Sequence, residues 1–125
     1  MKTIRQKHHL PATPEEVYLA LTNPFTIELW SGYPAEMSTK PDTEFSVFDG
    51  SIVGKNLYFE ENKLIRQQWY FEGEPEESIV TMRLTSEKNN TVVELLHTHV
   101  PDEVYEEMQE GWKKHYFGSL KRYFK

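Results

Sequence analysis

Apolar and polar side chains alternate along the central part of the chain. The clearest example is residues 78–87, where Val80, Met82 and Leu84 are separated by single polar residues. A period of two is typical of a β-strand with one buried and one solvent-exposed face. Residues 37–100 repeat such short runs between turn signals, and this pattern predicts an antiparallel meander.

Turn-forming residues divide this region into strands. A first strand is predicted for residues 1–10, because Pro11 then removes a backbone donor. Five strands follow, so that the sheet has six strands, or seven if residues 37–39 also form one. The turn signals that separate the later strands are Asp49-Gly50, Glu61-Asn62 and Lys88-Asn89-Asn90.

Two short helices are predicted after the first strand. Thr13-Pro14-Glu15-Glu16 supplies the hydroxyl, the proline and the glutamate of a helix N-terminus with a capping box. Asn23 precedes Pro24, and the residue before a proline is disfavoured in helical conformation, so the first helix ends there. The second helix is expected to end at Ser31-Gly32.

After Pro101 the apolar spacing becomes helical and stays so to the end of the chain, which predicts one helix about 33 Å long. Asp102 is its predicted N-cap. Phe117 and Phe124 fall outside the main apolar arc and are expected near its rims. The arc itself consists of Val104, Tyr105, Met108, Trp112, Tyr116, Ser119, Leu120 and Tyr123.

Two glycines, Gly111 and Gly118, interrupt this helix along one edge of the arc. A glycine inside a helix costs about 1 kcal/mol relative to alanine. We interpret the pair as a place where another backbone or a ligand comes close. The alternative is that the glycines arose by neutral sequence change at surface positions. Gly50 and Gly54, in contrast, are assigned to a hairpin turn and a bulge.

Composition narrows the functional classes. The 125 residues fit one domain, residues 1–125, and a net charge of -6 disfavours a nucleic-acid partner. The absence of cysteine excludes disulfides and thiolate chemistry. No apolar run approaches the roughly 20 residues of a membrane span, and we expect a cytoplasmic protein.

Five stretches carry a family resemblance: Ala20-Leu21-Thr22-Asn23-Pro24 with Trp30, FSVFDGSIVG, IRQQWYF, the stretch from His97 to Pro101, and GWKKHYFGSLKRYF. Together they resemble the C-terminal domain of the activator of heat-shock protein 90 ATPase family, over nearly the whole chain. The resemblance implies an α+β helix-grip fold of the START-like, birch-pollen-allergen-like group. In that fold a curved antiparallel sheet wraps around the long C-terminal helix.

The same resemblance implies an interior groove or cavity between sheet and helix, which holds an apolar ligand in many relatives. The chain departs from the family pattern at FEGEPEESI, which lacks the usual Trp-Pro-x-Gly-His-like segment. Eukaryotic activators also carry a separate N-terminal domain that makes much of the chaperone contact, and this sequence has nothing before Met1. Chaperone activation is therefore not expected to transfer automatically.

His97 and His99 are candidates for polar chemistry. Strand alternation would place both imidazoles on one sheet face, about 6–7 Å apart, and His115 could approach them from the helix. Three histidines could bind zinc. The alternative is that the imidazoles are hydrogen-bonded polar lining, and we adopt it, expecting no metal and no other cofactor. The paired glutamates fall in turns or on an exposed helix face and do not indicate a catalytic pair.

Our leading interpretation is a non-enzymatic protein that binds an apolar or amphipathic small molecule between the sheet and the C-terminal helix. The alternatives are a co-chaperone-like interaction module that acts on a heat-shock protein 90 ATPase, and an enzyme that uses the same cavity. A monomer or weak dimer is expected. The predicted ligand-binding residues are Trp30, Phe48, Trp69, His97, His99, Met108, Trp112, His115 and Tyr116.

Overall fold

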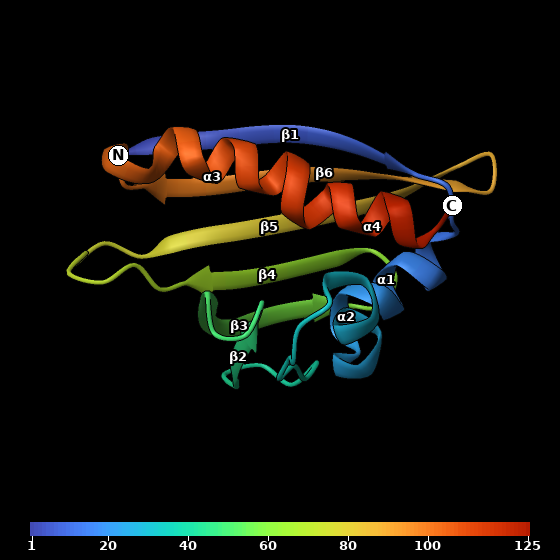
Figure 1. Cartoon of the computed structure of the whole chain (residues 1–125), viewed down its shortest axis with the longest axis horizontal. Helices are drawn as coiled ribbons and strands as arrows, with labels where there is room; N and C mark the ends of the chain where they lie inside the picture. The colour runs from blue at the N-terminus through green and yellow to red at the C-terminus, as the bar shows by residue number, and fades with distance from the viewer.

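One antiparallel sheet forms the framework of the computed structural model, which describes residues 1–125 (Figure 1). Its six strands lie in the order β1-β6-β5-β4-β3-β2, so β2 to β6 form a meander and β1 pairs with β6 at one edge. Six strands are confirmed, but residues 37–39 form none, and only one bridge joins Glu36 to Ser46. The strands are β1 (Lys2–Leu10), β2 (Glu44–Val47), β3 (Ile52–Glu60), β4 (Leu64–Trp69), β5 (Ser78–Glu87) and β6 (Asn90–Val100).

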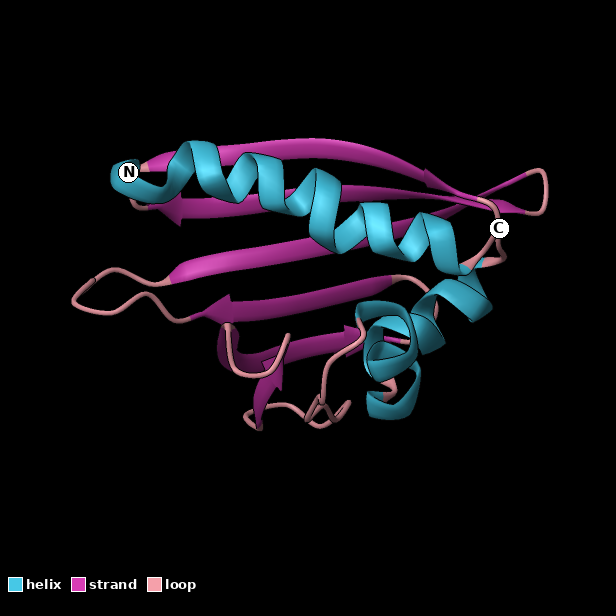
Figure 2. Cartoon of the chain, viewed as in Figure 1, coloured by secondary structure: helices cyan, strands magenta, loops and turns pink.

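Helices cover one face of the sheet, and the long C-terminal segment crosses it obliquely (Figure 2). This arrangement confirms the predicted α+β helix-grip fold, with two short helices after the first strand. None of the helices combines the length and the apolar character that a membrane crossing requires. The helical elements are α1 (Pro14–Thr22), α2 (Pro24–Ser31), a 3-10 turn (Asp102–Val104), α3 (Tyr105–Gly111), a π-helical turn (Trp112–Tyr116) and α4 (Phe117–Tyr123).

Local capping explains where the short helices begin and end. The Thr13 side chain accepts a hydrogen bond from the Glu16 backbone, and the Glu16 carboxylate accepts one from the Thr13 backbone, which confirms the capping box. Gly32 ends α2 in the left-handed conformation. The predicted cap at Asp102 is wrong: its side chain makes no capping bond, and its carboxylate instead lies 3.0 Å from the N-terminal amine.

A single π-helical turn changes the phase of the C-terminal segment. The Phe117 amide donates to the Trp112 carbonyl, five residues back, instead of four. The extra residue rotates everything after it, so that Phe117 is fully buried and Tyr123 is 41% exposed. Both positions contradict the predicted arc, which assumed 3.6 residues per turn throughout.

The core lies between the sheet and this helical layer. Phe117 and Leu120 from α4 belong to one cluster of buried side chains, together with Val80 of β5 and Val93 of β6. Trp112 and Tyr116 belong to the same cluster and are nearly buried. The space predicted between helix and sheet is thus largely filled by the chain's own side chains, and an open groove remains beside the helix.

Candidate functional site

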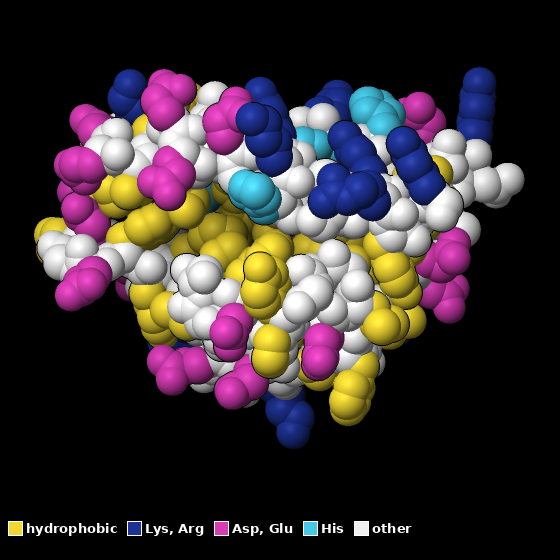
Figure 3. Space-filling view, viewed as in Figure 1, with side chains coloured by type: hydrophobic (Ala, Val, Ile, Leu, Met, Phe, Trp, Pro, Cys, Tyr) yellow, Lys and Arg dark blue, Asp and Glu magenta, His cyan; other side chains and the backbone are white.

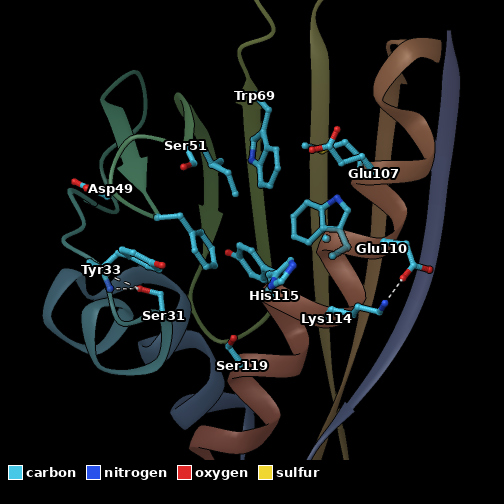
Figure 4. Close-up of a pocket in the computed structure, with 16 residues that line it drawn as sticks. Ser31, Tyr33, Asp49, Ser51, Trp69, Glu107, Glu110, Lys114, His115 and Ser119 are labelled. Atoms are coloured by element: carbon cyan, nitrogen blue, oxygen red, sulfur yellow. Dashed lines mark hydrogen bonds and ion pairs between the residues drawn. The ribbon is translucent and has the colours of Figure 1, made fainter.

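The groove has a volume of about 760 Å³ and lies where the C-terminal helical segment passes the β2–β3 loop and the end of α2. In the space-filling view it is a hollow with a hydrophobic floor between charged side chains (Figure 3). Figure 4 shows the side chains that converge on it from these elements and from β4. Its lining consists of Ser31, Tyr33, Phe48, Asp49, Ser51, Ile52, Trp69, Glu107, Met108, Glu110, Gly111, Trp112, Lys114, His115, Tyr116 and Ser119.

Two stacked indoles form the centre of the floor. The rings of Trp69 and Trp112 lie 4.6 Å apart at an angle of 25°, and the Tyr116 ring lies 4.6 Å from Trp112. Offset stacking of this kind favours a fixed arrangement of large apolar surfaces. The Trp69 indole also donates a hydrogen bond to Gln67 Oε1 at 3.2 Å. The floor is therefore held in place from the sheet and from the helix.

A buried hydrogen-bond chain fixes Trp112. Its indole N–H donates to His97 Nδ1 at 3.1 Å, and since an indole nitrogen can only donate, His97 carries its proton on Nε2. That N–H then donates to Ser78 Oγ at 2.8 Å, and the serine hydroxyl donates to the Thr98 carbonyl at 2.9 Å. The Ser78–His97 pair is therefore oriented to hold Trp112, and His97 has no free lone pair with which to activate the serine.

The β2–β3 loop, residues 48–51, brings Phe48 over the groove. Val47 pairs with Ile52, and Phe48, Asp49 and Gly50 all have positive φ, which turns the chain back within four residues. The Phe48 ring consequently lies 6.0 Å from the Tyr116 ring. The predicted hairpin is confirmed, and its loop forms one wall of the site.

The rim of the groove is predominantly acidic. It carries the carboxylates of Asp49, Glu107 and Glu110 and one ammonium group, that of Lys114. Lys114 is itself paired with Glu110 at 3.0 Å, as the dashed line in Figure 4 shows. An anionic ligand would therefore meet net repulsion at the rim.

Six of the nine predicted site residues line the groove: Phe48, Trp69, Met108, Trp112, His115 and Tyr116. Trp30 and His97 do not. Trp30 is buried, donates its indole N–H to the Ala20 carbonyl at 2.7 Å, and packs edge-on against Tyr116. His97 is buried beneath Trp112. Both residues support the floor from behind.

His99 is the third predicted site residue that does not line the groove. The prediction that it shares a sheet face with His97 is wrong. Ile4 pairs with His97 and Lys2 with Val100, so β6 holds one more residue than β1 between these pairs. This bulge gives His99 a φ of 53° and turns its imidazole outward, where Nε2 lies 3.6 Å from Glu76. No group of three or more His, Asp or Glu side chains is placed to hold a metal ion.

Sequence reasoning missed eight further lining residues, most of them polar. Gly111 was interpreted as a place of close approach and Ser119 was placed on the helical arc, but neither was named as a ligand-binding residue, and both line the groove. The missed residues between the end of α2 and the start of β3 carry no such signal, because their positions depend on tertiary packing. Those missed residues are Ser31, Tyr33, Asp49, Ser51 and Ile52, along with Glu107, Glu110 and Lys114 on the helical side.

The free energy of unfolding is expected to decrease as the pH is lowered, because of His97. Burial lowers the pKa of His97 to about 3, whereas in the unfolded chain it titrates near 6.5. Below pH 6.5 His97 is therefore protonated in the unfolded state but not in the folded state. This difference lowers the free energy of unfolding by about 1.4 kcal/mol at pH 5.5. Burial, with nearby Lys121 and Lys113, also lowers the pKa of His8 to about 4, in the same direction.

Urea unfolding of wild type, His97→Gln and His99→Gln at pH 7.5 and 5.5 measures this effect. The difference between the two pH values should shrink by about 1.4 kcal/mol in His97→Gln. It should stay at the wild-type value in His99→Gln, because that imidazole is exposed. An equal pH difference in all three proteins would contradict the assignment.

Comparison with known sequences gives two results. A family model described as activator of Hsp90 ATPase homolog 1-like protein matches residues 11–125. The chain is also 27% identical over 123 residues to the Mus musculus protein named activator of 90 kDa heat shock protein ATPase homolog 1. That alignment covers 97% of this chain but 36% of the mouse protein, so the chain spans about a third of the length of this curated relative.

Solved structures with the same arrangement include an HSP90 activator from Plasmodium falciparum, with a TM-score of 0.89 and 25% identity. The match covers 98% of this chain and 96% of that one. An Aha1 dimer from Colwellia psychrerythraea matches with a TM-score of 0.86 at 20% identity, over 99% and 96% of the two chains. The second likeness is one of fold alone.

Proposed function

The chain belongs to the family of activator of Hsp90 ATPase homolog 1-like proteins, and from this premise we propose that it is a non-enzymatic binding module for an apolar or amphipathic small molecule. The observation that carries the proposal is the groove of about 760 Å³ with its floor of stacked aromatic rings. Ligand sites are typically concavities of about 300–1,000 Å³ with apolar walls and a few polar groups. Residues 1–125 are proposed to form one domain around it.

The chaperone activity of the relatives is not the leading proposal, since the chain spans about a third of the length of the mouse protein. The groove brings together side chains from β4, the β2–β3 loop and the C-terminal helical segment. Sites that several elements build together can bury most of a small ligand's surface.

The neutral dye Nile red, whose fluorescence rises in apolar surroundings, tests the proposal. We expect saturable binding to the wild type and at least tenfold weaker binding to Gly111→Leu. A Cβ added at Gly111 meets no neighbouring atom within 4 Å, and Gly111 lines the groove, so a leucine there is expected to extend into the groove volume. It also replaces a helical glycine, which should raise stability. Loss of binding in a more stable protein cannot be attributed to unfolding.

The matched control is Lys113→Leu, which adds the same side chain at an exposed position outside the groove lining. Its affinity for Nile red should stay within about twofold of the wild type. Equal binding by wild type and Gly111→Leu would place the dye elsewhere and count against the groove as the site.

A second candidate function is that of a co-chaperone-like module acting on an Hsp90 ATPase. The specific observation in its favour is that the family model and the mouse and Plasmodium falciparum relatives are all named as activators of this ATPase. ATP turnover by a purified Hsp90, measured with increasing amounts of this chain, tests it. Turnover should rise to a plateau; unchanged turnover without co-sedimentation would exclude the role for that chaperone.

A further inference from the structure

The Tyr116 hydroxyl is a polar group without a partner in the floor of the groove. The residue is 5% exposed and lines the groove. Its hydroxyl makes no hydrogen bond within the protein, yet no fully enclosed side-chain nitrogen or oxygen is left unpaired. The phenol oxygen therefore reaches the open space of the groove.

The other donors of the floor are already engaged. The Trp69 indole N–H is bonded to Gln67, and the Trp112 indole N–H is bonded to His97. Tyr116 is thus the one aromatic residue of the floor centre that can offer a hydrogen bond to a bound molecule. Burial raises the pKa of its phenol, so the hydroxyl keeps its proton at neutral pH and acts as a donor.

The surroundings of this hydroxyl restrict the ligand further. The indoles of Trp69 and Trp112 are stacked on each other and are 4% and 2% exposed. The apolar surface open to a ligand therefore comes mainly from the half-buried side chains of Phe48, Ile52 and Met108.

The acidic rim, with Asp49 and Glu107 beside the paired Glu110 and Lys114, repels an anion. A neutral acceptor therefore suits the hydroxyl better than a carboxylate does.

We propose that the groove selects a neutral, largely apolar molecule bearing a carbonyl oxygen, which accepts a hydrogen bond from the Tyr116 hydroxyl while its apolar part packs against Phe48 and Met108. This inference rests on the proposed small-molecule function of the same groove and specifies its ligand class. A buried donor left unpaired by an apolar ligand costs free energy, and this penalty gives the groove its preference for the carbonyl.

The test compares 1-tetralone with tetralin, which share a shape and differ by one carbonyl oxygen, and with 5,6,7,8-tetrahydro-1-naphthoate as the anion. Dissociation constants come from titrations of the 15N-labelled protein, followed through its tryptophan indole N–H signals. The Trp69 and Trp112 signals should move, because both rings line the groove. The Trp30 signal should move much less, since its N–H is bonded to Ala20 away from the lining.

The wild type is expected to bind 1-tetralone about fivefold more tightly than tetralin, and the naphthoate more weakly than the ketone. Tyr116→Phe should remove the preference for the ketone and leave tetralin binding within about twofold. Tyr58→Phe, which removes a hydroxyl from an exposed tyrosine outside the groove, should keep the wild-type preference.

Different results would overturn the small-molecule function and the ligand class. Failure of all three compounds to shift the Trp69 and Trp112 signals would overturn the small-molecule function at this groove, and the ligand class with it. Binding of tetralone and tetralin with an unchanged ratio in Tyr116→Phe would overturn the ligand class and leave the groove as a site. Tighter binding of the naphthoate would overturn the requirement for a neutral molecule.

Discussion

Trp112→Ala is expected to lower the free energy of unfolding by about 4 kcal/mol, because it removes a large side chain from the junction of core and groove. Trp112 is 2% exposed and its ring contacts those of Trp69 and Tyr116. The substitution also leaves His97 Nδ1 without the indole donor that it accepts from, and an unpaired buried acceptor adds to the cost of the cavity. Urea unfolding followed by far-UV circular dichroism measures the loss.

Two variants separate these contributions. Trp112→Phe keeps most of the ring volume and removes the N–H, so it should lose about half as much as the alanine variant. Tyr123→Ala removes an aromatic ring that is 41% exposed and should change the free energy of unfolding by less than about 1 kcal/mol. A loss below about 1.5 kcal/mol for Trp112→Ala would show that the ring does not join core and groove as described.

Gly54→Ala is expected to destabilise the fold by about 3 kcal/mol. Gly54 lies on β3 opposite Trp69 of β4, and a Cβ added there would meet the Gln68 backbone oxygen at 1.9 Å and the Phe45 ring at 2.8 Å. The backbone oxygen belongs to the paired strand, so it can move only if the two strands separate. The register shift on β3 falls between Asn56 and Tyr58, and the expectation of a bulge at Gly54 is therefore wrong.

Gly111→Ala is the matched control, because it adds the same methyl group where no atom lies within 4 Å. It should raise the free energy of unfolding by about 0.5–1 kcal/mol, as expected for a helical glycine replaced by alanine. Thermal unfolding of both variants under one condition tests the opposite signs. A stabilising Gly54→Ala would mean that β3 and β4 are not as closely paired as the structure has them.

Elements encoded by short-range chemistry were predictable from the sequence. Thr13 with Glu16 begins α1 and Asn23-Pro24 ends it, as expected, because these signals act between residues at most a few positions apart. Asp49-Gly50 marked the hairpin for the same reason. Asn23 also caps α2, which was not predicted. These signals act within one turn and need no knowledge of the rest of the fold.

Features that depend on packing were not predictable in this way. The π-helical turn was not predicted from the sequence, and it shifts the phase of the helix at the point where Phe117 is buried, while Tyr123 beyond it is exposed. The bulge that turns His99 outward is visible only when β1 and β6 are aligned residue by residue. Gly118 likewise needs no approaching ligand, because a Cβ there would meet the Lys113 carbonyl of its own helix at 2.9 Å.

The residues of the candidate site fall into the same two groups: some are predictable from local sequence, and others depend on packing. Met108, Trp112 and Tyr116 could be inferred from helical spacing, and Trp69 and Phe48 from their strand and its hairpin. Tyr33 and Asp49 enter the lining because separate elements fold towards the helix, and no periodicity anticipates that. The unpaired state of the Tyr116 hydroxyl is a property of the whole site rather than of any stretch of sequence.

The π-helical turn also divides one continuous helical segment into a first half that can tolerate substitution and a second half that cannot. α3 has no buried residue, while α4 contributes Phe117 and Leu120 to the interior. Substitutions in α3 can therefore change which ligands the groove binds without disturbing the core. Substitutions of Phe117 or Leu120 in α4 would instead destabilise the fold.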